Sequence, residues 1–195
     1  GVIYAHSHVG LCFYPSTVGF VHPAARERDL FGEVVVRAHA AGIAAVAYLS
    51  VIYDTAAYRA HPDWRIVDAT GREVAADSRY GVCCPNAPYR DYIRALGAEV
   101  ATRYAVDGVR FDMTFWPAVC YCGHCRARFR AESGAELPTT VDWHDPRWVA
   151  FQRAREAWLG DFAACLTAAV RAVRPAASVE HQSSVYLANW RLGVT

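Results

Sequence analysis

Lysine is absent from this sequence, and arginine supplies all twenty of its basic residues. Nineteen acidic residues balance them, so the net charge at pH 7 is only +1. Because neither sign of charge is in excess, the chain lacks the electrostatic signature of proteins that bind nucleic acid or anionic membranes, and we expect neither partner. A composition rich in alanine and arginine but without lysine indicates GC-rich coding DNA and favours a bacterial source.

Long apolar runs are absent too, and none approaches the roughly 18 residues that a membrane-spanning helix needs. No basic segment followed by an apolar stretch indicates a signal peptide, so we expect a cytoplasmic protein. Methionine is nearly absent: Met113 is the single one, and the sequence does not begin at a start residue. We therefore expect residues 1–195 to be an internal part of one larger domain.

Hydrophobic residues make up 54% of the chain, which provides a core and excludes a disordered protein. Apolar runs rich in β-branched residues predict four strands, at residues 2–5, 43–51, 108–111 and 178–181. Helical periodicity with start and stop signals predicts helices at about 30–41, 88–104, 124–132 and 146–173. A small hairpin is expected between residues 64 and 75.

The alternation of strands and helices predicts parallel strands joined by right-handed crossovers. An open doubly wound sheet and part of a (β/α)₈ barrel both satisfy this pattern. The long, polar loops all follow strands, whereas the returns from helix to strand are short. This asymmetry is typical of a barrel whose active face lies at the carboxyl ends of its strands. We therefore predict a partial (β/α)₈ barrel of about four βα units.

The third predicted strand ends in an aspartate. Side chains alternate along a strand, so Arg110 and Asp112 share one face while Val109 and Phe111 share the other. In a barrel the apolar pair would meet the helices, and Asp112 would face the interior at the active mouth. A carboxylate beside a guanidinium stays ionised, which suits a nucleophile at an anomeric carbon better than a proton donor. The alternative is a structural Arg–Asp pair.

Histidines close the first and the last predicted strand. His6 and His8 are two residues apart and are expected on one face, where they could bind sugar hydroxyls, ligate a metal or fill polar space. No third zinc ligand is evident near them. At the last strand, alternation allows only one of Glu180 and His181 to face the interior. Glu180 is the local candidate for a general acid.

Three aromatic residues in the loops after the strands offer faces on which a sugar could stack: Tyr53, Trp64 and Trp116. Asp54 follows the second strand and could reach the same pocket. As a single acid in a loop, however, it is more typical of a solvated turn residue, and we favour that interpretation.

Cysteine is frequent and clustered. The chain contains seven, and an odd number in tight clusters makes a poor disulfide framework. Cys120, Cys122 and Cys125 have a spacing that lets three thiolates converge on one tetrahedral zinc ion at distances near ~2.3 Å. The fourth ligand has three local candidates, which are Cys83, Cys84 and His124.

The motifs together resemble α-L-fucosidases, and more closely the related family of hypothetical glycoside hydrolases. The resemblance covers nearly the whole chain and rests on the stretch from Ala5 to Pro23, Tyr48-Leu49-Ser50, His61-Pro62-Asp63-Trp64, Cys84-Pro85-Asn86-x-Pro88-Tyr89-Arg90 and Asp107-Gly-x-Arg110-x-Asp112. It implies a single (β/α)₈ glycoside hydrolase catalytic domain with a carbohydrate substrate and Asp112 as nucleophile. It also implies that His8 binds the sugar and that His181 belongs to the substrate-binding region, whereas His6 stands where that family more often has lysine.

The cysteine cluster resembles the zinc site of barrel-fold β-galactosidases, in which a Cys-Tyr-Cys-x-x-Cys string precedes a helix. In those enzymes the fourth cysteine lies in a Cys-Pro-Asn string, which here selects Cys84. A zinc ion held by Cys84, Cys120, Cys122 and Cys125 has no open position, so its role would be structural, and we expect no catalytic cofactor.

The leading hypothesis is a retaining, fucosidase-like glycosidase that acts through Asp112. A β-galactosidase-like hydrolase is the second, although Met113-Thr114 does not supply the Asn-Glu pair that such enzymes carry here. A non-catalytic, zinc-stabilised sugar-binding barrel is the third, and a metal-dependent hydrolase using His6 and His8 the fourth. As an isolated segment the chain is expected to be inactive and to aggregate through two open sheet edges. A homo-oligomer of the full-length protein stays open.

Overall fold

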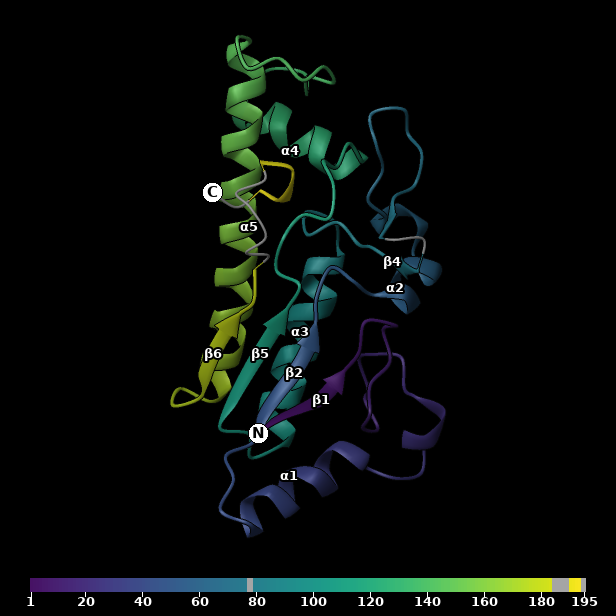
Figure 1. The fold of residues 1–195 in the computed structure, drawn as a ribbon, viewed down its shortest axis with the longest axis vertical. Coiled ribbons are helices and arrows are strands. Elements are labelled where there is room, and N and C mark those ends of the chain that lie inside the picture. Colours follow the sequence, from purple (N-terminus) through teal and green to yellow (C-terminus); the bar gives the residue numbers. More distant parts are fainter. Residues whose placement is uncertain (77–78, 184–189, 194–195) are drawn as a thin grey trace.

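The computed structural model describes residues 1–76, 79–183 and 190–193 (Figure 1). Its main sheet has four parallel strands in the order β1-β2-β5-β6, with bounds Val2–His6, Val46–Ser50, Gly108–Asp112 and Ser178–His181. All four predicted strands are confirmed. Because the strands are parallel, their carboxyl ends meet at one edge of the sheet, and the long loops gather there.

The four predicted helices are confirmed as α1 Leu30–Ala40, α3 Tyr89–Arg103, α4 Gly123–Ser133 and α5 Pro146–Val173. Asp29 starts α1, because its carboxylate accepts a hydrogen bond from the amide of Gly32 at 2.8 Å. Gly134 ends α4 in the left-handed conformation, with φ of 70°. Within the described residues, no helix combines the length and the apolar character that crossing a bilayer requires.

The segment between β2 and α3 is more structured than predicted. It contains the short helix α2, Thr55–Ala60, and a second sheet in which β3, Ala75–Ala76, pairs with β4, Tyr80–Gly81. The expected small hairpin is confirmed: Val67 and Glu73 form an antiparallel bridge, and the amides of Asp68 and Val74 donate to the carbonyl oxygens of Arg72 and Ile66. Single 3-10 turns complete the fold at Pro23–Ala25, Pro62–Trp64 and Trp190–Leu192.

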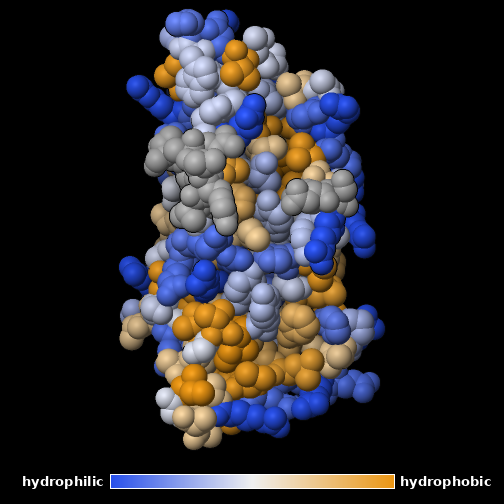
Figure 2. All heavy atoms as spheres, viewed as in Figure 1, coloured by the Kyte–Doolittle hydropathy of each residue, from blue (hydrophilic) through white to orange (hydrophobic). Residues whose placement is uncertain are grey.

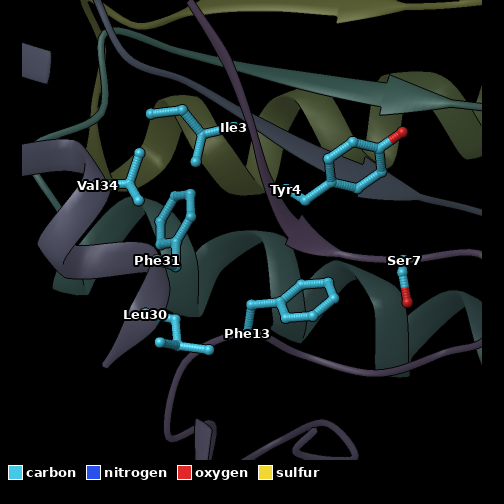
Figure 3. Close-up of a pocket in the computed structure, with 7 residues that line it drawn as sticks. All are labelled: Ile3, Tyr4, Ser7, Phe13, Leu30, Phe31 and Val34. Atoms are coloured by element: carbon cyan, nitrogen blue, oxygen red, sulfur yellow. The ribbon is translucent and has the colours of Figure 1, made fainter. Parts of the chain in front are cut away.

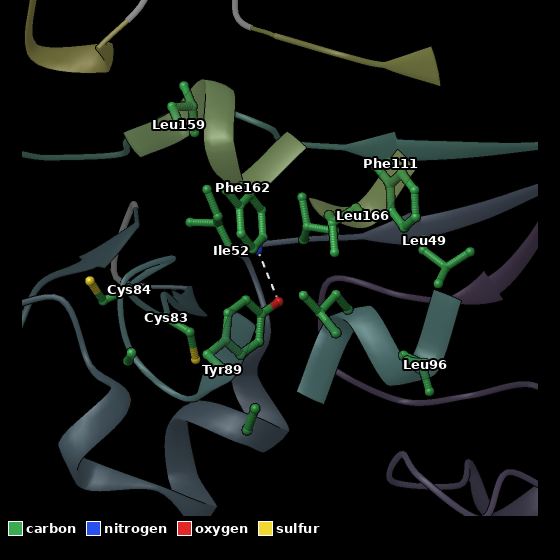
Figure 4. Packing of buried hydrophobic residues seen from close by; sticks show 14 of the residues in the cluster. Leu49, Ile52, Cys83, Cys84, Tyr89, Leu96, Phe111, Leu159, Phe162 and Leu166 are labelled. Carbon is green, nitrogen blue, oxygen red and sulfur yellow. Dashed lines mark hydrogen bonds between the residues drawn. The ribbon is translucent and has the colours of Figure 1, made fainter. Parts of the chain in front are cut away.

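Helices α3 and α5 cover one face of the sheet (Figures 1 and 4). Leu49 and Phe111 point from the strands toward Leu96 of α3 and Leu166 of α5, and all four side chains are buried. This is the side on which Val109 and Phe111 were predicted to meet the helices. The opposite face of β5 therefore carries the polar side chains that are relevant to function.

An apolar groove of about 450 Å³ runs between β1 and α1 (Figure 3). Phe13, Leu30, Phe31 and Val34 line it together with Ile3 of the strand. Hydrophobic residues also gather over the lower part of the face in Figure 2, where α1 and the amino-terminal ends of the strands lie. The groove contains none of the carboxylates discussed below, so it is a packing surface at the edge of the sheet.

Candidate active site and metal centre

The polar face of the sheet brings side chains from neighbouring strands together. Tyr48 of β2 lies opposite Arg110 of β5, which in turn lies opposite Glu180 of β6. The Arg110 guanidinium is 3.5 Å from the Glu180 carboxylate, with Nη1 facing Oε2. The expected Arg–Asp pairing is therefore wrong in its partner: Arg110 reaches across to the next strand instead of along its own strand to Asp112.

Asp112, at the carboxyl end of β5, is held by a hydroxyl group. Tyr48 donates a hydrogen bond from its hydroxyl to Asp112 Oδ2. The same hydroxyl lies 3.1 Å from His8 Nε2, and His8 Nδ1 lies 2.6 Å from Ser50 Oγ. Ser50 in turn donates to the carbonyl oxygen of Tyr53 at 2.8 Å. One continuous polar chain thus links Asp112 to the loop after β2.

The protonation of this chain follows from its surroundings. Burial lowers the pKa of His8, and the negative charge of Asp112 opposes that shift. Burial, followed by the hydrogen bond to Asp112, raises the pKa of Tyr48 far above its usual range. Tyr48 therefore remains a neutral hydroxyl at any physiological pH, whereas the two opposing effects on His8 leave its proton sensitive to the state of Asp112.

His6 and His8 differ in exposure: His6 is fully buried and His8 is half-buried, although both rings contact Ser50. The pairing of β1 with β2 shifts register between Tyr4 and His6, and a turn closed by the Gly10 amide on the Ser7 carbonyl follows. These two features turn His8 toward Tyr48 and leave His6 fully buried. His6 is therefore unable to contact a substrate.

The partner of His6 is Asp54, which is also fully buried. His6 Nε2 lies 3.5 Å from Asp54 Oδ2, and His6 Nδ1 lies 3.0 Å from the carbonyl oxygen of Ser50. The other oxygen of Asp54 accepts a hydrogen bond from the amide of Ala57 and caps α2. The expectation that Asp54 is a solvated turn residue is wrong, because a helix start that sequence periodicity missed encloses it.

His181 faces the helices, so its predicted role in substrate binding is not supported by its position. Its ring stacks on Phe111 with centroids 5.2 Å apart, and its Nε2 lies 2.8 Å from Thr167 Oγ1 of α5. Because neighbouring residues of a strand face opposite ways, Glu180 takes the interior side. The alternative that the sequence left open is thereby decided for Glu180.

The three predicted aromatic residues separate in the structure. Tyr53 lies beside His8, with ring centroids 6.3 Å apart. Trp64 instead stacks on His61 at 3.6 Å and contacts rings of α3. Trp116 is fully buried, and its Nε1 donates to the carbonyl oxygen of Arg155 at 3.0 Å. Neither tryptophan presents a face to the polar side of the sheet, which corrects the prediction that they stack on a sugar.

Two residues of this site were missed as functional candidates, Tyr48 and Ser50. Both belong to the Tyr-Leu-Ser string at the end of β2, and alternation places them on the same face as their register partners Arg110 and Asp112. That alternation was readable in the sequence. The sequence did not reveal the strand register, which pairs Ser50 of β2 with Asp112 of the adjacent strand β5.

A second cluster lies in the loops beyond the same edge of the sheet. Cys84, Cys120, Cys122 and Cys125 are buried, and their sulfur atoms all lie within 4.8 Å of one another. Cys83 points elsewhere, with its Sγ 3.8 Å from the Asp54 carbonyl oxygen. The four-cysteine set selected in the sequence is the one that the fold brings together.

The donor set fits a tetrahedral metal ion. Four thiolates about 2.3 Å from one zinc would be separated by about 3.8 Å, and the sulfur atoms of Cys84 and Cys125 are 3.5 Å apart. Asn86 Nδ2 lies 3.3 Å from Cys125 Sγ, while its carbonyl accepts a hydrogen bond from Arg128. Hydrogen bonds from the neighbouring thiols strongly lower the pKa of Cys122, so the cluster favours a thiolate. Asn86, a part of the Cys-Pro-Asn string, thus supports the ligand sulfurs from outside.

Backbone strain marks the exits of two strands. Ile52 and Met113 have φ of 67° and 65°, in the left-handed region that side chains rarely adopt. Ile52 is held there by a hydrogen bond from its amide to the Tyr89 hydroxyl at 3.0 Å (Figure 4). Met113 directly follows Asp112. Such strain is typical of functional loops, where the surrounding structure fixes a side chain against its local preference.

Solved structures of glycosidases share the fold of this chain. The α-L-fucosidase isoenzyme 2 from Paenibacillus thiaminolyticus superposes with a TM-score of 0.74 and 25% identity over 93% of this chain. The glycoside hydrolase domain of PgaB (BpsB) from Bordetella bronchiseptica has a TM-score of 0.70 at 16% identity, over 92% of this chain and 54% of that one. The β-galactosidase from Marinomonas ef1 has a TM-score of 0.65 at 16% identity, over 87% of this chain and 30% of that one.

These likenesses confirm the predicted partial (β/α)₈ barrel, and the chain spans only 26% of the fucosidase. No curated protein sequence matches the chain. A family model described as hypothetical glycosyl hydrolase 6 matches residues 1–113, which is more than half of the sequence. The resemblance to hypothetical glycoside hydrolases is confirmed, and the chain belongs to the hypothetical glycosyl hydrolase 6 family.

Proposed function

We propose that the protein is a retaining glycosidase of the α-L-fucosidase type and that Asp112 is its nucleophile. The observation that carries the proposal is the position of Asp112. It lies at the carboxyl end of an interior-facing strand, and the Tyr48 hydroxyl orients its carboxylate. In barrel enzymes this end of a strand is where catalytic residues are found. A carboxylate there can attack an anomeric carbon and form a covalent glycosyl intermediate.

The surrounding side chains suit the binding of sugar hydroxyls. His8, Tyr53 and Arg110 are all half-buried and lie on or next to the polar face, where they can donate or accept hydrogen bonds. Glu180 lies on the neighbouring strand, level with Arg110 and so two residues below Asp112, and it is the candidate general acid. A retaining mechanism requires about 5–5.5 Å between acid and nucleophile.

We further propose one structural zinc ion in the four-cysteine cluster. Its ligands come from the loop before α3, from the segment that joins β5 to α4 and from the first turn of α4, so the metal would fasten these parts of the chain to one another. When bound, zinc supplies this crosslink and no open coordination position. The loop that begins at Asp112 would thereby be held in place.

The substitution Asp112→Gly in the full-length protein tests the nucleophile. We expect activity toward aryl α-L-fucosides to fall at least ~1000-fold, equivalent to about 4 kcal/mol in the barrier. Azide should restore turnover by occupying the vacated position, with inversion of the product. Asp142→Gly, which removes an exposed carboxylate far along the chain, is the control and should keep full activity. Unchanged activity in Asp112→Gly would end the proposal.

A β-galactosidase-like specificity is the second candidate, and the four-cysteine cluster is the observation that favours it. A panel of nitrophenyl glycosides separates the two, since each specificity predicts a different preferred sugar. Saturable binding of sugars without turnover across the whole panel would instead favour a non-catalytic sugar-binding barrel.

A further inference from the structure

The number of hydrogen atoms in the polar chain from Asp112 to Tyr53 follows from its contacts. It contains four contacts: Asp112 with Tyr48, Tyr48 with His8, His8 with Ser50, and Ser50 with the Tyr53 carbonyl. Each contact needs one hydrogen. The carbonyl oxygen can only accept, so the Ser50 hydroxyl must donate to it. His8 Nδ1 must then carry a hydrogen to donate to Ser50.

The remaining two contacts share the Tyr48 hydroxyl, which has a single hydrogen. If Tyr48 donates to Asp112, His8 Nε2 must donate to Tyr48, and His8 is an imidazolium facing a carboxylate. If Tyr48 donates to His8, Asp112 must donate to Tyr48, and both end groups are neutral. In either arrangement the chain holds one proton beyond those of a neutral histidine and a carboxylate.

We propose that Tyr48 is a positioning residue that relays this one proton between Asp112 and His8, so that the nucleophile is ionised while His8 holds the proton. The inference rests on the proposed role of Asp112. In the transfer, the Asp112 O–H bond breaks as a bond to the Tyr48 oxygen forms, and the Tyr48 O–H bond breaks as a bond to His8 Nε2 forms. The pair has zero net charge before and after.

The environment of the relay is compatible with both proton positions. Burial disfavours charge on His8 while the Asp112 carboxylate favours it, so the two effects act against each other. A state with a Tyr48 phenolate between a protonated Asp112 and a protonated His8 is excluded, because burial and the hydrogen bond to Asp112 raise the pKa of Tyr48 far above its usual range. The titratable and charged side chains that face the relay from the surrounding elements are Tyr4, His6, Tyr53, Tyr80, Arg110 and Glu180.

The test is a double-mutant cycle read from the imidazole signals of His8 by NMR during a pH titration. Asp112→Asn mimics the neutral acid, so it should fix the Tyr48 hydrogen on His8 Nε2. We expect the titration midpoint of His8 to fall by about one pH unit or more, a tenfold change in proton affinity. With Tyr48→Phe also present, Asp112→Asn should shift the midpoint far less, because the connection is cut.

A charge effect through space would survive the loss of the hydroxyl group. An equal shift caused by Asp112→Asn with and without Tyr48→Phe would therefore overturn the relay. Tyr80→Phe is the matched control: its ring lies 5.6 Å from that of His8, but its hydroxyl is outside the chain of contacts, so the midpoint should not move.

The unmodified protein provides a second measurement that does not depend on any variant folding. The relay requires His8 Nδ1 to carry hydrogen throughout and Nε2 to be the nitrogen that titrates. Nitrogen chemical shifts that show a neutral Nε2–H form would contradict it. Because neither readout uses turnover, failure of the relay leaves the nucleophile assignment standing, and an inactive enzyme leaves the relay testable.

Discussion

Asp54 shows how a single buried carboxylate connects two parts of this site. One oxygen caps α2, and the other lies beside His6 at the end of β1, where no other hydrogen-bond partner is described for either atom of the pair. The His6 ring also holds the Ser50 carbonyl, and Ser50 contacts His8. Asp54 and His6 thus support the polar face of the sheet through Ser50, without contacting Asp112 or Tyr48 themselves.

Asp54→Ala should lower the free energy of unfolding by about 2–4 kcal/mol. The loss of a helix cap contributes about 1 kcal/mol, and a buried His6 left without its partner contributes about 1–3 kcal/mol. Asp54→Asn keeps the capping oxygen and should cost less. Urea unfolding of the two variants checks this. Equal decreases in the free energy of unfolding would show that the helix cap makes no separate contribution to stability.

At the scale of elements, the glycine that caps α4 and a glycine inside α5 make a matched pair. Gly134 has φ of 70°, so Gly134→Ala forces a side chain into the left-handed region at a cost of roughly 1–2 kcal/mol. Gly160 is an exposed position inside α5 with open space around it, so Gly160→Ala should stabilise the protein by about 0.5–1 kcal/mol. Thermal unfolding should give opposite signs, and a stabilising Gly134→Ala would contradict the assigned cap.

The cysteine cluster gives the second prediction at this scale. In reducing buffer we expect about one zinc per chain by elemental analysis, because four thiolates close one tetrahedral site. Cys122→Ser should remove the metal and lower the unfolding temperature. Cys165→Ser, which changes a half-buried cysteine of α5 outside the cluster, should retain both. Protein without metal, or metal retained in Cys122→Ser, would contradict the proposed zinc site.

Helix α5 was predictable to the residue from the sequence, because Pro146 follows a capping aspartate and Pro175 follows the last turn. The six-residue α2 was not, because it has a single cap and too few positions for periodicity to show. The same limit applies to the difference in burial between His6 and His8. Alternation holds only within a regular strand, and the register shift in β1 and the turn after it cannot be read from spacing.

At the scale of the whole molecule, the described sheet has two edge strands, β1 and β6. The apolar groove lies along β1, and Val2, Val36 and Ile43 are exposed near the same end of the molecule. Unpaired strand edges beside apolar surface favour association between chains. We expect the 195-residue chain on its own to self-associate in a concentration-dependent manner, which sedimentation or light scattering would detect. A sharp, cooperative melt of a monomer would contradict this expectation.

The central claim is that Asp112 forms a covalent bond with the sugar, and trapping that intermediate tests it most directly. The full-length protein would be incubated with a 2-deoxy-2-fluoro fucosyl fluoride, digested and analysed by mass spectrometry. The account predicts one added fluoroglycosyl group on the peptide that contains Asp112, at the Asp112 carboxylate. A label on another carboxylate, such as Glu180, or turnover that leaves Asp112 unlabelled, would contradict it.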